Sequence, residues 1–347
     1  MTAPPTVDLP MPVVGSLSPS RASDFKTCPL LYRFRCIDRI PERPTLDKLR
    51  GTVVHAVLDR LFDLPAEQRT YPAAAALVEP EWQRLVEAEP EVTRLFAAAA
   101  TTTGAADGAG GAEGAEAAGG AGGAEAAGGA EAAEGVGGAE GVGGAEGAGG
   151  APGAPGAPGL ADWLGSARSL LAGYFALEDP RRLEPAAREQ LVEVMLEGGV
   201  LLRGYVDRLD VAPTGEIRVV DYKTGGIPRE AYEVRALFQL KFYALVLWRT
   251  RGTVPRQLRL MYLGDRDTLT YVPEADELAR FERTLLAIWR AIERATATGD
   301  FRASPSRLCD WCDHRAICPA HGGTPPPYRP PDTLLPDRAD PGAGGSA

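Results

Sequence analysis

The sequence predicts an α/β protein built on a mixed sheet, and three observations support this. Runs with an apolar repeat near 3.6 residues, such as LDKLRGTVVHAVLDRLFDL, are typical of helices that bury one face. Other short runs, such as EIRVVDYKTG, are rich in β-branched and aromatic residues and are typical of strands. The turn signal PTGE separates two such runs and predicts an antiparallel hairpin.

The elements are expected in the order helix, three strands, helix, short hairpin and helix. The first part is helical: a Ser cap opens a helix in SPSRASDFKTCPLLYRFRC, and LDKLRGTVVHAVLDRLFDL forms the next. A further helix, SARSLLAGYFAL, precedes strands at QLVEVML, VLLRGYVDRLDVA and EIRVVDYKTG. The remaining elements are a helix at YEVRALFQLKFYALVLWRT, a hairpin of QLRLMYLG with TLTYVP, and an amphipathic helix at DELARFERTLLAIWRAIERA.

Composition divides the chain into five parts. Its 347 residues are 44% hydrophobic, which is enough for a core. Residues 97–159 repeat Gly, Ala and Glu and offer few side chains that can pack, so they are expected to form a disordered insertion without a function of their own. The other expected parts are a flexible N-terminus (1–13), an N-terminal helical part (14–96), a core that holds the strands and a Cys-rich segment (160–323), and a disordered tail (324–347).

The formal charge of −10 does not exclude nucleic acid as a partner. The insertion carries eight acidic residues and neither Lys nor Arg, and removing those eight negative charges from the total leaves −2. A nearly neutral folded part can still carry a basic groove. The net charge therefore decides nothing about the partner.

The N-terminus lacks the basic and apolar regions of a secretory signal, and no apolar run reaches membrane-spanning length. The sequence predicts a cytoplasmic protein that makes no membrane contact. In that reducing compartment, closely spaced members of the five cysteines are better interpreted as metal or cluster ligands than as disulfides.

Asp221 and Lys223 lie two apart in a predicted strand, so their side chains share a face. Asp207 lies on the strand that the PTGE turn folds back against this one, which brings the two acids within a few residues of each other. Two convergent carboxylates suit Mg²⁺ or Mn²⁺, with Lys223 serving the attacking water or the charge on a phosphate. Lys223 is one of only four lysines among 37 basic residues, which gives this amine weight. Taken alone, the Asp–Lys pair would be an ordinary ion pair.

The runs GYVDRLD, VVDYKTG and QLKFY, with a Gly51-to-His55 element upstream, resemble the PD-(D/E)XK nuclease superfamily and its RecB-type exonuclease branch. The resemblance implies a restriction-endonuclease-like core. It also implies metal ligands at His55, Asp207, Asp221 and the carbonyl of Tyr222, with Lys223 as the catalytic lysine. Gln239 and Tyr243 match the accessory motif that contacts DNA or the metal-bound water. Glu193, on the preceding strand, is a weaker acidic candidate.

Cys309, Cys312 and Cys318 are spaced closely enough to share one metal centre, which needs a fourth ligand from Cys28 or Cys36. The resemblance favours Cys28 and a [4Fe-4S] cluster, since related nucleases hold one with a single N-terminal and three C-terminal cysteines. Such a cluster would tie the two ends of the domain together. Structural Zn²⁺, with Cys28, His314 or His321 completing the set, is the alternative. Cys36 is then an ordinary buried thiol.

The leading hypothesis is a metal-dependent deoxyribonuclease of the RecB exonuclease type, acting on single-stranded DNA in repair or recombination. The chain has no phosphate-binding loop, so a separate helicase chain would supply any motor. One alternative is a catalytically silent iron–sulfur module that binds DNA or a partner, and another is a nuclease of CRISPR adaptation. Backbone contacts and base stacking are predicted for six residues: Arg33, Arg35, Arg203, Arg208, Tyr32 and Tyr205.

Overall fold

The computed structural model describes residues 15–96, 158–226 and 233–331. Its centre is a mixed six-stranded sheet in the order β1-β3-β4-β5-β6, with β2 also pairing with β3. β1 with β3 and β4 with β5 are parallel, and the other neighbours are antiparallel. The predicted mixed α/β fold is thereby confirmed. The strands are β1 (Ser16–Leu17), β2 (Ala187–Met195), β3 (Leu201–Val211), β4 (Ile217–Lys223), β5 (Gln257–Tyr262) and β6 (Asp267–Tyr271).

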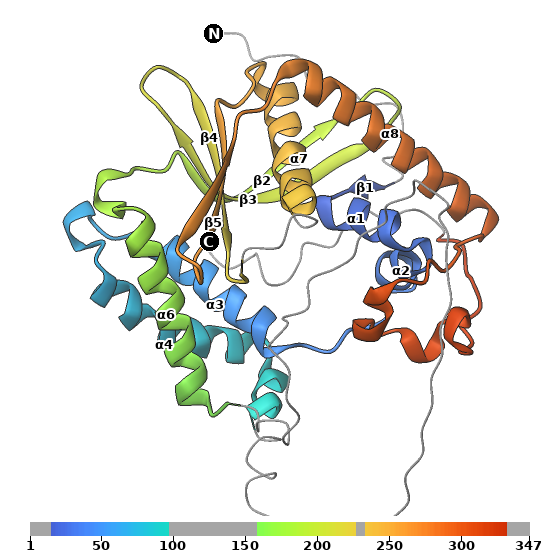
Figure 1. The fold of residues 1–347 in the computed structure, drawn as a ribbon, viewed down its shortest axis with the longest axis horizontal. Coiled ribbons are helices and arrows are strands. Elements are labelled where there is room, and N and C mark those ends of the chain that lie inside the picture. Colours follow the sequence, from blue (N-terminus) through green and yellow to red (C-terminus); the bar gives the residue numbers. More distant parts are fainter. Residues whose placement is uncertain (1–14, 97–157, 227–232, 332–347) are drawn as a thin grey trace, which may run out of the picture.

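Helices cover both faces of this sheet, as Figure 1 shows. One core cluster joins α3, α4 and α6 to side chains of β4 and β5, and a second joins α1, α2, α7 and α8 to the opposite face. The helices are α1 (Pro19–Thr27), α2 (Pro29–Tyr32), α3 (Leu46–Leu61), α4 (Tyr71–Ala88), α6 (Leu160–Leu177), α7 (Glu233–Arg251) and α8 (Ala275–Thr298). A π-helix η1 (Arg33–Ile37) continues α2, and short 3₁₀ turns make up most of the Cys-rich segment: η6 (Arg307–Trp311), η7 (Arg315–Ile317) and η8 (Pro319–His321).

Local sequence accounts for several helix ends. The predicted Ser cap is Ser18, whose hydroxyl accepts a hydrogen bond from the Arg21 N–H, and Thr45 caps α3 in the same way. α8 ends at Gly299, which has φ +71° and satisfies the left-handed position. Helix α4 is not among the predicted elements. It contains Pro80, which weakens the helical pattern, and buries Trp82 against α6.

The predicted hairpin turn connects β3 and β4, and Gly215 in PTGE adopts φ +88°. The register pairs Arg208 with Val220 and Leu209 with Val219, so the predicted antiparallel pairing is confirmed. β5 and β6 likewise form the expected second hairpin. These two hairpins and the parallel pairing of β4 with β5 set the frame in which the candidate residues lie.

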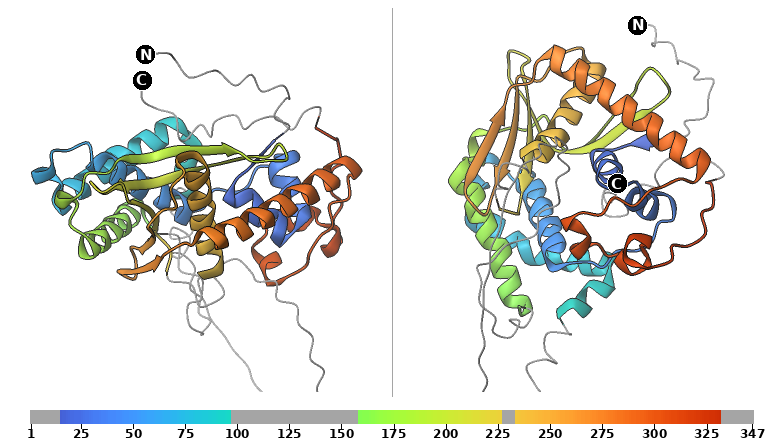
Figure 2. Two further views of the ribbon diagram at one scale, coloured as in Figure 1. Left: turned by 90° about the horizontal axis from the view of Figure 1, so that it is seen from above. Right: turned by 45° about the vertical axis from the view of Figure 1, so that its right-hand side comes forward.

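The two ends of the described chain meet. In both views of Figure 2, the orange-red C-terminal segment lies beside the blue helices α1 and α2. Nearly all of the predicted insertion lies outside the described residues. Residues 324–331 of the predicted disordered tail are described and pack on the core: the Tyr328 hydroxyl donates to the Thr296 carbonyl, and its ring packs on Phe301. The tail prediction is therefore corrected for these residues. Across the described helices, none combines the length and the apolar content that crossing a bilayer would require.

Candidate functional site

The hairpin of β3 and β4 brings the two predicted acids together. Extending its register by one pair places Asp207 opposite Asp221. The Tyr222 N–H donates to Asp207 Oδ2 at 2.7 Å, so the Asp207 side chain reaches across to β4. Asp221 is 2% exposed, on the strand face that carries the buried Val219. Both acids are thus held on one face at the C-terminal end of β4.

Lys223 lies beside Asp221 on the same face. Its Nζ is 2.6 Å from Asp221 Oδ2 and 2.8 Å from Gln239 Oε1 on α7. Gln239 Nε2 in turn donates to the Tyr243 hydroxyl at 3.1 Å. Gln239 therefore orients the lysine, and Tyr243 orients Gln239. The resemblance implies a different role for these two residues, namely contact with DNA or with the metal-bound water.

Two glycines allow the helices to approach this site closely. A Cβ on Gly204 of β3 would lie 2.8 Å from Cε1 of the Tyr243 ring, which packs directly on that strand. A Cβ on Gly51 of α3 would lie 3.3 Å from the Thr224 hydroxyl, just past the end of β4. The small residue at position 51 lets α3 bring His55, one turn later, over the strand end.

His55 closes the site from α3. Its Nε2 is 3.1 Å from the Tyr222 carbonyl oxygen, and its Nδ1 is 3.6 Å from Asp207 Oδ2. Because a carbonyl oxygen only accepts, Nε2 carries a proton in this contact, which leaves Nδ1 facing the carboxylates. A ring nitrogen anchored to a carbonyl while the other faces a metal is a common arrangement for a ligating histidine.

Glu189 on β2 is the site residue that sequence reasoning missed. The β2–β3 register pairs Arg188 with Arg208 and Gln190 with Val206, which places Glu189 opposite Asp207. Its Oε1 is 3.7 Å from His55 Nδ1. Glu189 has φ +41°, a strained value for a residue with a side chain, of the kind that gathers at functional sites.

The acidic candidate predicted on this strand, Glu193, does not lie at the site. It is exposed and lies opposite Arg203, four residues beyond Glu189. Only the pairing of β2 with β3 distinguishes the two glutamates. Knowing which residue lies opposite Asp207 was the signal that would have identified Glu189.

His55, Glu189 and Asp207 each offer one ligand atom within 4.8 Å of the others, and in the described ranges this is the group of three suited to a metal ion. One imidazole nitrogen with carboxylate oxygens suits a divalent cation such as Mg²⁺ or Mn²⁺. Of the four predicted ligands, His55 and Asp207 belong to this group. Asp221 is paired with Lys223 instead, and the Tyr222 carbonyl faces His55.

The electrostatics match a site that concentrates negative charge. Burial, with the charge of Asp221 adding to it, raises the pKa of Asp207 to about 7, although His55 opposes the shift. Burial would lower the pKa of His55, but the charges of Asp207 and Glu189 outweigh it and raise that pKa to about 9. Burial would also lower the pKa of Lys223, but the charge of Asp221 outweighs it, so this pKa is raised and the amine stays protonated.

Four of the five cysteines gather where the N- and C-terminal segments meet. The cavity of about 110 Å³ between the N- and C-terminal segments is lined by all four predicted ligands: Cys28, Cys309, Cys312 and Cys318. Cys28 Sγ accepts from the Ser304 N–H at 3.4 Å, which ties the two segments together. Burial raises the pKa of Cys312, and neighbouring Cys28 and Cys309 add to it.

Within the described part of the chain the sulfurs share this cavity but form no group of three within 4.8 Å of one another. His314 and His321, the alternative zinc ligands, also line the cavity. Cys36 is not among its lining residues and packs on the main core cluster.

Several predicted DNA contacts are wrong because the side chains are buried. Arg208, Arg33 and Tyr32 are 0%, 5% and 3% exposed. Arg33 pairs with Asp38, and Arg208 lies in an ionic network on the far side of β3. Arg35 is paired with Asp24 and Glu42. Arg203 and Tyr205 are half-buried on β3.

Comparison with known proteins agrees with this arrangement. The chain is similar to the Gene 69 protein of Mycobacterium phage D29, with 31% identity over 136 residues, which is 38% of this chain and 48% of the relative. It is also similar to the Gene 69 protein of Mycobacterium phage L5, with 29% identity over 124 residues, or 35% and 40% of the two chains. The chain thus spans about half the length of these relatives, or less.

The sequence profile of the PD-(D/E)XK nuclease superfamily matches residues 16–113 and 146–319, which is well over half of the chain and includes the acids, His55, Lys223 and the four predicted cysteine ligands. The mixed sheet flanked by helices is consistent with the fold of this superfamily. The chain therefore belongs to the PD-(D/E)XK nuclease superfamily.

Proposed function

We propose that this protein is a Mg²⁺- or Mn²⁺-dependent deoxyribonuclease that hydrolyses phosphodiester bonds, acting as a RecB-type exonuclease on single-stranded DNA. The observation that carries the proposal is the position of Lys223, bonded to Asp221 and Gln239, beside the acids and the imidazole that can hold a cation. Repair or recombination, with a helicase supplied by another chain, is the setting that fits such an activity. The cytoplasmic location stays a prediction from the sequence.

The residues divide the chemistry among them. A bound divalent cation would lower the pKa of water and polarise the phosphate. His55, Asp207 and Glu189 would hold it, and Asp221, next to them in the β3–β4 register, would complete its carboxylate surroundings. Lys223 is protonated, so its role is to donate to a phosphate oxygen or to the attacking water and to offset the charge that develops on phosphorus. Water attacks phosphorus, the bond to the 3′ oxygen breaks, and the leaving oxygen takes up a proton.

The test is Mn²⁺-dependent cleavage of end-labelled single- and double-stranded DNA by the full chain, followed over time. Removing the acid in Asp221→Ala or the amine in Lys223→Ala should lower the cleavage rate at least about 100-fold, because each loses a charged group at the reacting phosphate. Unchanged cleavage by Asp221→Ala would overturn the proposal, and a lack of cleavage by the unsubstituted protein would favour a silent binding module. Products that shorten from one end support an exonuclease, whereas internal cuts favour a nuclease of the CRISPR adaptation type.

We further propose that Cys28, Cys309, Cys312 and Cys318 hold a [4Fe-4S] cluster. The shared cavity supports a common centre. The close spacing of Cys309, Cys312 and Cys318 with a remote Cys28 follows the pattern of the related nucleases, whereas a compact zinc knuckle would keep its ligands local. Anaerobically purified protein should be brown with about four irons per chain. A colourless protein with one zinc ion would establish the alternative.

A further inference from the structure

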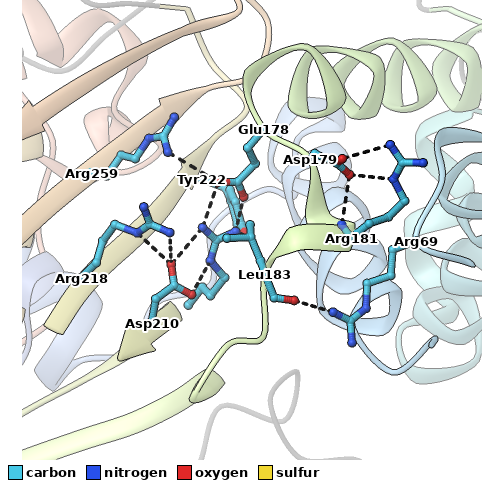
Figure 3. A network of polar contacts seen from close by, with 10 residues as sticks. Arg69, Glu178, Asp179, Arg181, Leu183, Asp210, Arg218, Tyr222 and Arg259 are labelled. Atoms are coloured by element: carbon cyan, nitrogen blue, oxygen red, sulfur yellow. Dashed lines mark hydrogen bonds and ion pairs between the residues drawn. The ribbon is translucent and has the colours of Figure 1, made fainter. Parts of the chain in front are cut away.

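A buried ionic network lies on the face of the sheet opposite Asp207 and Asp221, and Figure 3 shows its members Glu178, Asp210 and Tyr222. Arg208 contacts all three of them. Although it is charged, Arg208 is 0% exposed. Its guanidinium donates to Glu178 Oε2 at 3.1 Å, to Asp210 Oδ2 at 3.2 Å and to the Tyr222 hydroxyl at 2.8 Å. Glu178 comes from the end of α6, and Arg259 of β5 approaches it at 3.5 Å. The network therefore connects α6 with β3, β4 and β5.

Tyr222 links this network to the candidate site. Its side chain lies on the network face, whereas its main chain serves the other face. Its N–H donates to Asp207 Oδ2 at 2.7 Å, and its carbonyl oxygen is 3.1 Å from His55 Nε2. The Tyr222 ring also meets the His55 ring edge-on, with centroids 5.9 Å apart. Two of the three residues grouped for a metal ion are thus held by one tyrosine.

Stability does not explain why charges are buried here. A buried ion pair contributes little net stability, because desolvation offsets the attraction, and well-packed apolar residues often do as well. What such a pair supplies is a defined geometry, since its hydrogen bonds are satisfied in one arrangement. Tyr222 is 4% exposed, and within the described chain Arg208 is the donor recorded for its hydroxyl.

We propose that Glu178, Arg208 and the Tyr222 hydroxyl are positioning residues for the ion site. Arg208, oriented by Glu178, fixes the Tyr222 ring. The fixed ring sets the main chain of Tyr222, and that main chain sets the Asp207 carboxylate and the His55 imidazole. The inference rests on the proposed metal-dependent function, but it concerns cation binding and can be tested without cleavage.

The experiment measures Mn²⁺ affinity by electron paramagnetic resonance on metal-free full-length protein, along with kcat, KM and urea unfolding. Tyr222→Phe keeps the ring and main chain and removes only the hydroxyl. It should weaken Mn²⁺ binding about tenfold and lower kcat with an unchanged KM for DNA. Arg208→Met should do the same or more. The double variant should be no worse than Arg208→Met alone, because both changes break one link.

Arg69→Met is the matched control. Arg69 is 4% exposed. Its guanidinium donates to the Leu64, Phe62 and Leu183 carbonyls, and among the described residues it makes no hydrogen bond to Tyr222. It should lose stability and keep wild-type Mn²⁺ affinity. Three outcomes would overturn the positioning role without touching the proposed function. They are wild-type Mn²⁺ affinity in Tyr222→Phe, additive losses of affinity in the double variant, and an equal loss of affinity in Arg69→Met. Unchanged cleavage by Asp221→Ala would instead overturn the proposed function.

Discussion

Lys223 Nζ lies 2.8 Å from Oε1 of Gln239, so a helix residue sixteen positions away orients the candidate catalytic lysine. This contact connects α7 to the end of β4 and gives the helix motif a physical role. The amide accepts from the ammonium and donates to Tyr243, and neither bond needs DNA to be present.

Replacing Gln239 with Ala should therefore lower activity without unfolding the protein. Lys223 would keep Asp221 as a partner but lose the group that holds it in line. We expect kcat to fall about 10- to 100-fold and KM for DNA to stay unchanged, measured by steady-state Mn²⁺-dependent cleavage. Arg249→Ala is the control and should retain full activity, because Arg249 lies on the same helix but pairs with Glu282 of α8. A rise in KM with unchanged kcat would instead indicate a direct DNA contact.

Glu189 should contribute to cation affinity, and Glu193 should not. Glu189→Gln removes a negative charge 3.7 Å from His55, whereas Glu193→Gln removes one on the same strand that lies opposite Arg203 of β3. Calorimetric titration with Mn²⁺ should show about tenfold weaker binding for Glu189→Gln and wild-type binding for Glu193→Gln. Equal affinities in the two variants would remove Glu189 from the ligand set.

Position 204 should tolerate no side chain. In Gly204→Ala the new Cβ would lie 2.8 Å from the Tyr243 ring and 3.5 Å from Pro19. This overpacking should cost about 1–3 kcal/mol of unfolding free energy, and displacement of Tyr243 should lower kcat. Gly165→Ala, in α6 with open space around it, is the control and should be neutral or stabilising by about 0.5–1 kcal/mol. Urea unfolding gives both values, and equal stabilities would show that Tyr243 can move aside at no cost.

Cation binding should strengthen as the pH rises. The pKa of Asp207 is raised to about 7 and that of His55 to about 9, and both groups must lose a proton to ligate. The folding stability of the metal-free protein should instead fall as the pH rises. A pKa that is raised on folding stabilises the protein below the unfolded value and ceases to do so as the pH passes the folded value. For His55 that window runs from 6.5 to about 9.

Urea unfolding of the metal-free protein should therefore show a steady loss of stability across that window. His55→Gln should flatten it. Stability that is constant from about pH 6.5 to 9 in the unsubstituted protein would contradict the assignment of the raised pKa to His55.

The two N-terminal cysteines should behave differently. Cys28 lines the cavity that the three C-terminal cysteines share, whereas Cys36 packs on the core outside it. Cys28→Ser should lose the bound metal and lower the melting temperature, because the link between the chain ends is broken. Cys36→Ser should keep its metal. Metal analysis and thermal unfolding test both, and metal loss in Cys36→Ser with retention in Cys28→Ser would reverse the assignment.

Strand alternation and one turn were enough to predict that Asp207, Asp221 and Lys223 gather. Both signals are local, since the side chains of a strand alternate and a short turn sets the register of its hairpin. The same alternation assigns Arg208 and Tyr222 to the face opposite the acids. Arg208 was nevertheless predicted to contact DNA, because the sequence does not show that α3, α4 and α6 bury that face.

Glu189 was missed because the expected strand QLVEVML begins at Gln190, whereas β2 begins at Ala187. β2 and β3 form a hairpin joined through residues 196–200, and its register sets Glu189, not Glu193, opposite Asp207. His55 comes from a helix more than 160 residues away from Tyr222 in the chain, and its contact with the carbonyl at 3.1 Å forms only when α3 packs on the sheet.

The sequence by itself determined the mixed α/β class, the hairpin that pairs the acids and the cysteine spacing, because each follows from residues close together in the chain. Only the tertiary structure decided that Glu189 joins His55 and Asp207, that Gln239 serves Lys223, and that Arg208 lies beneath the site. Those relationships depend on which faces are buried and which strands are in register, and the packing of distant segments sets both.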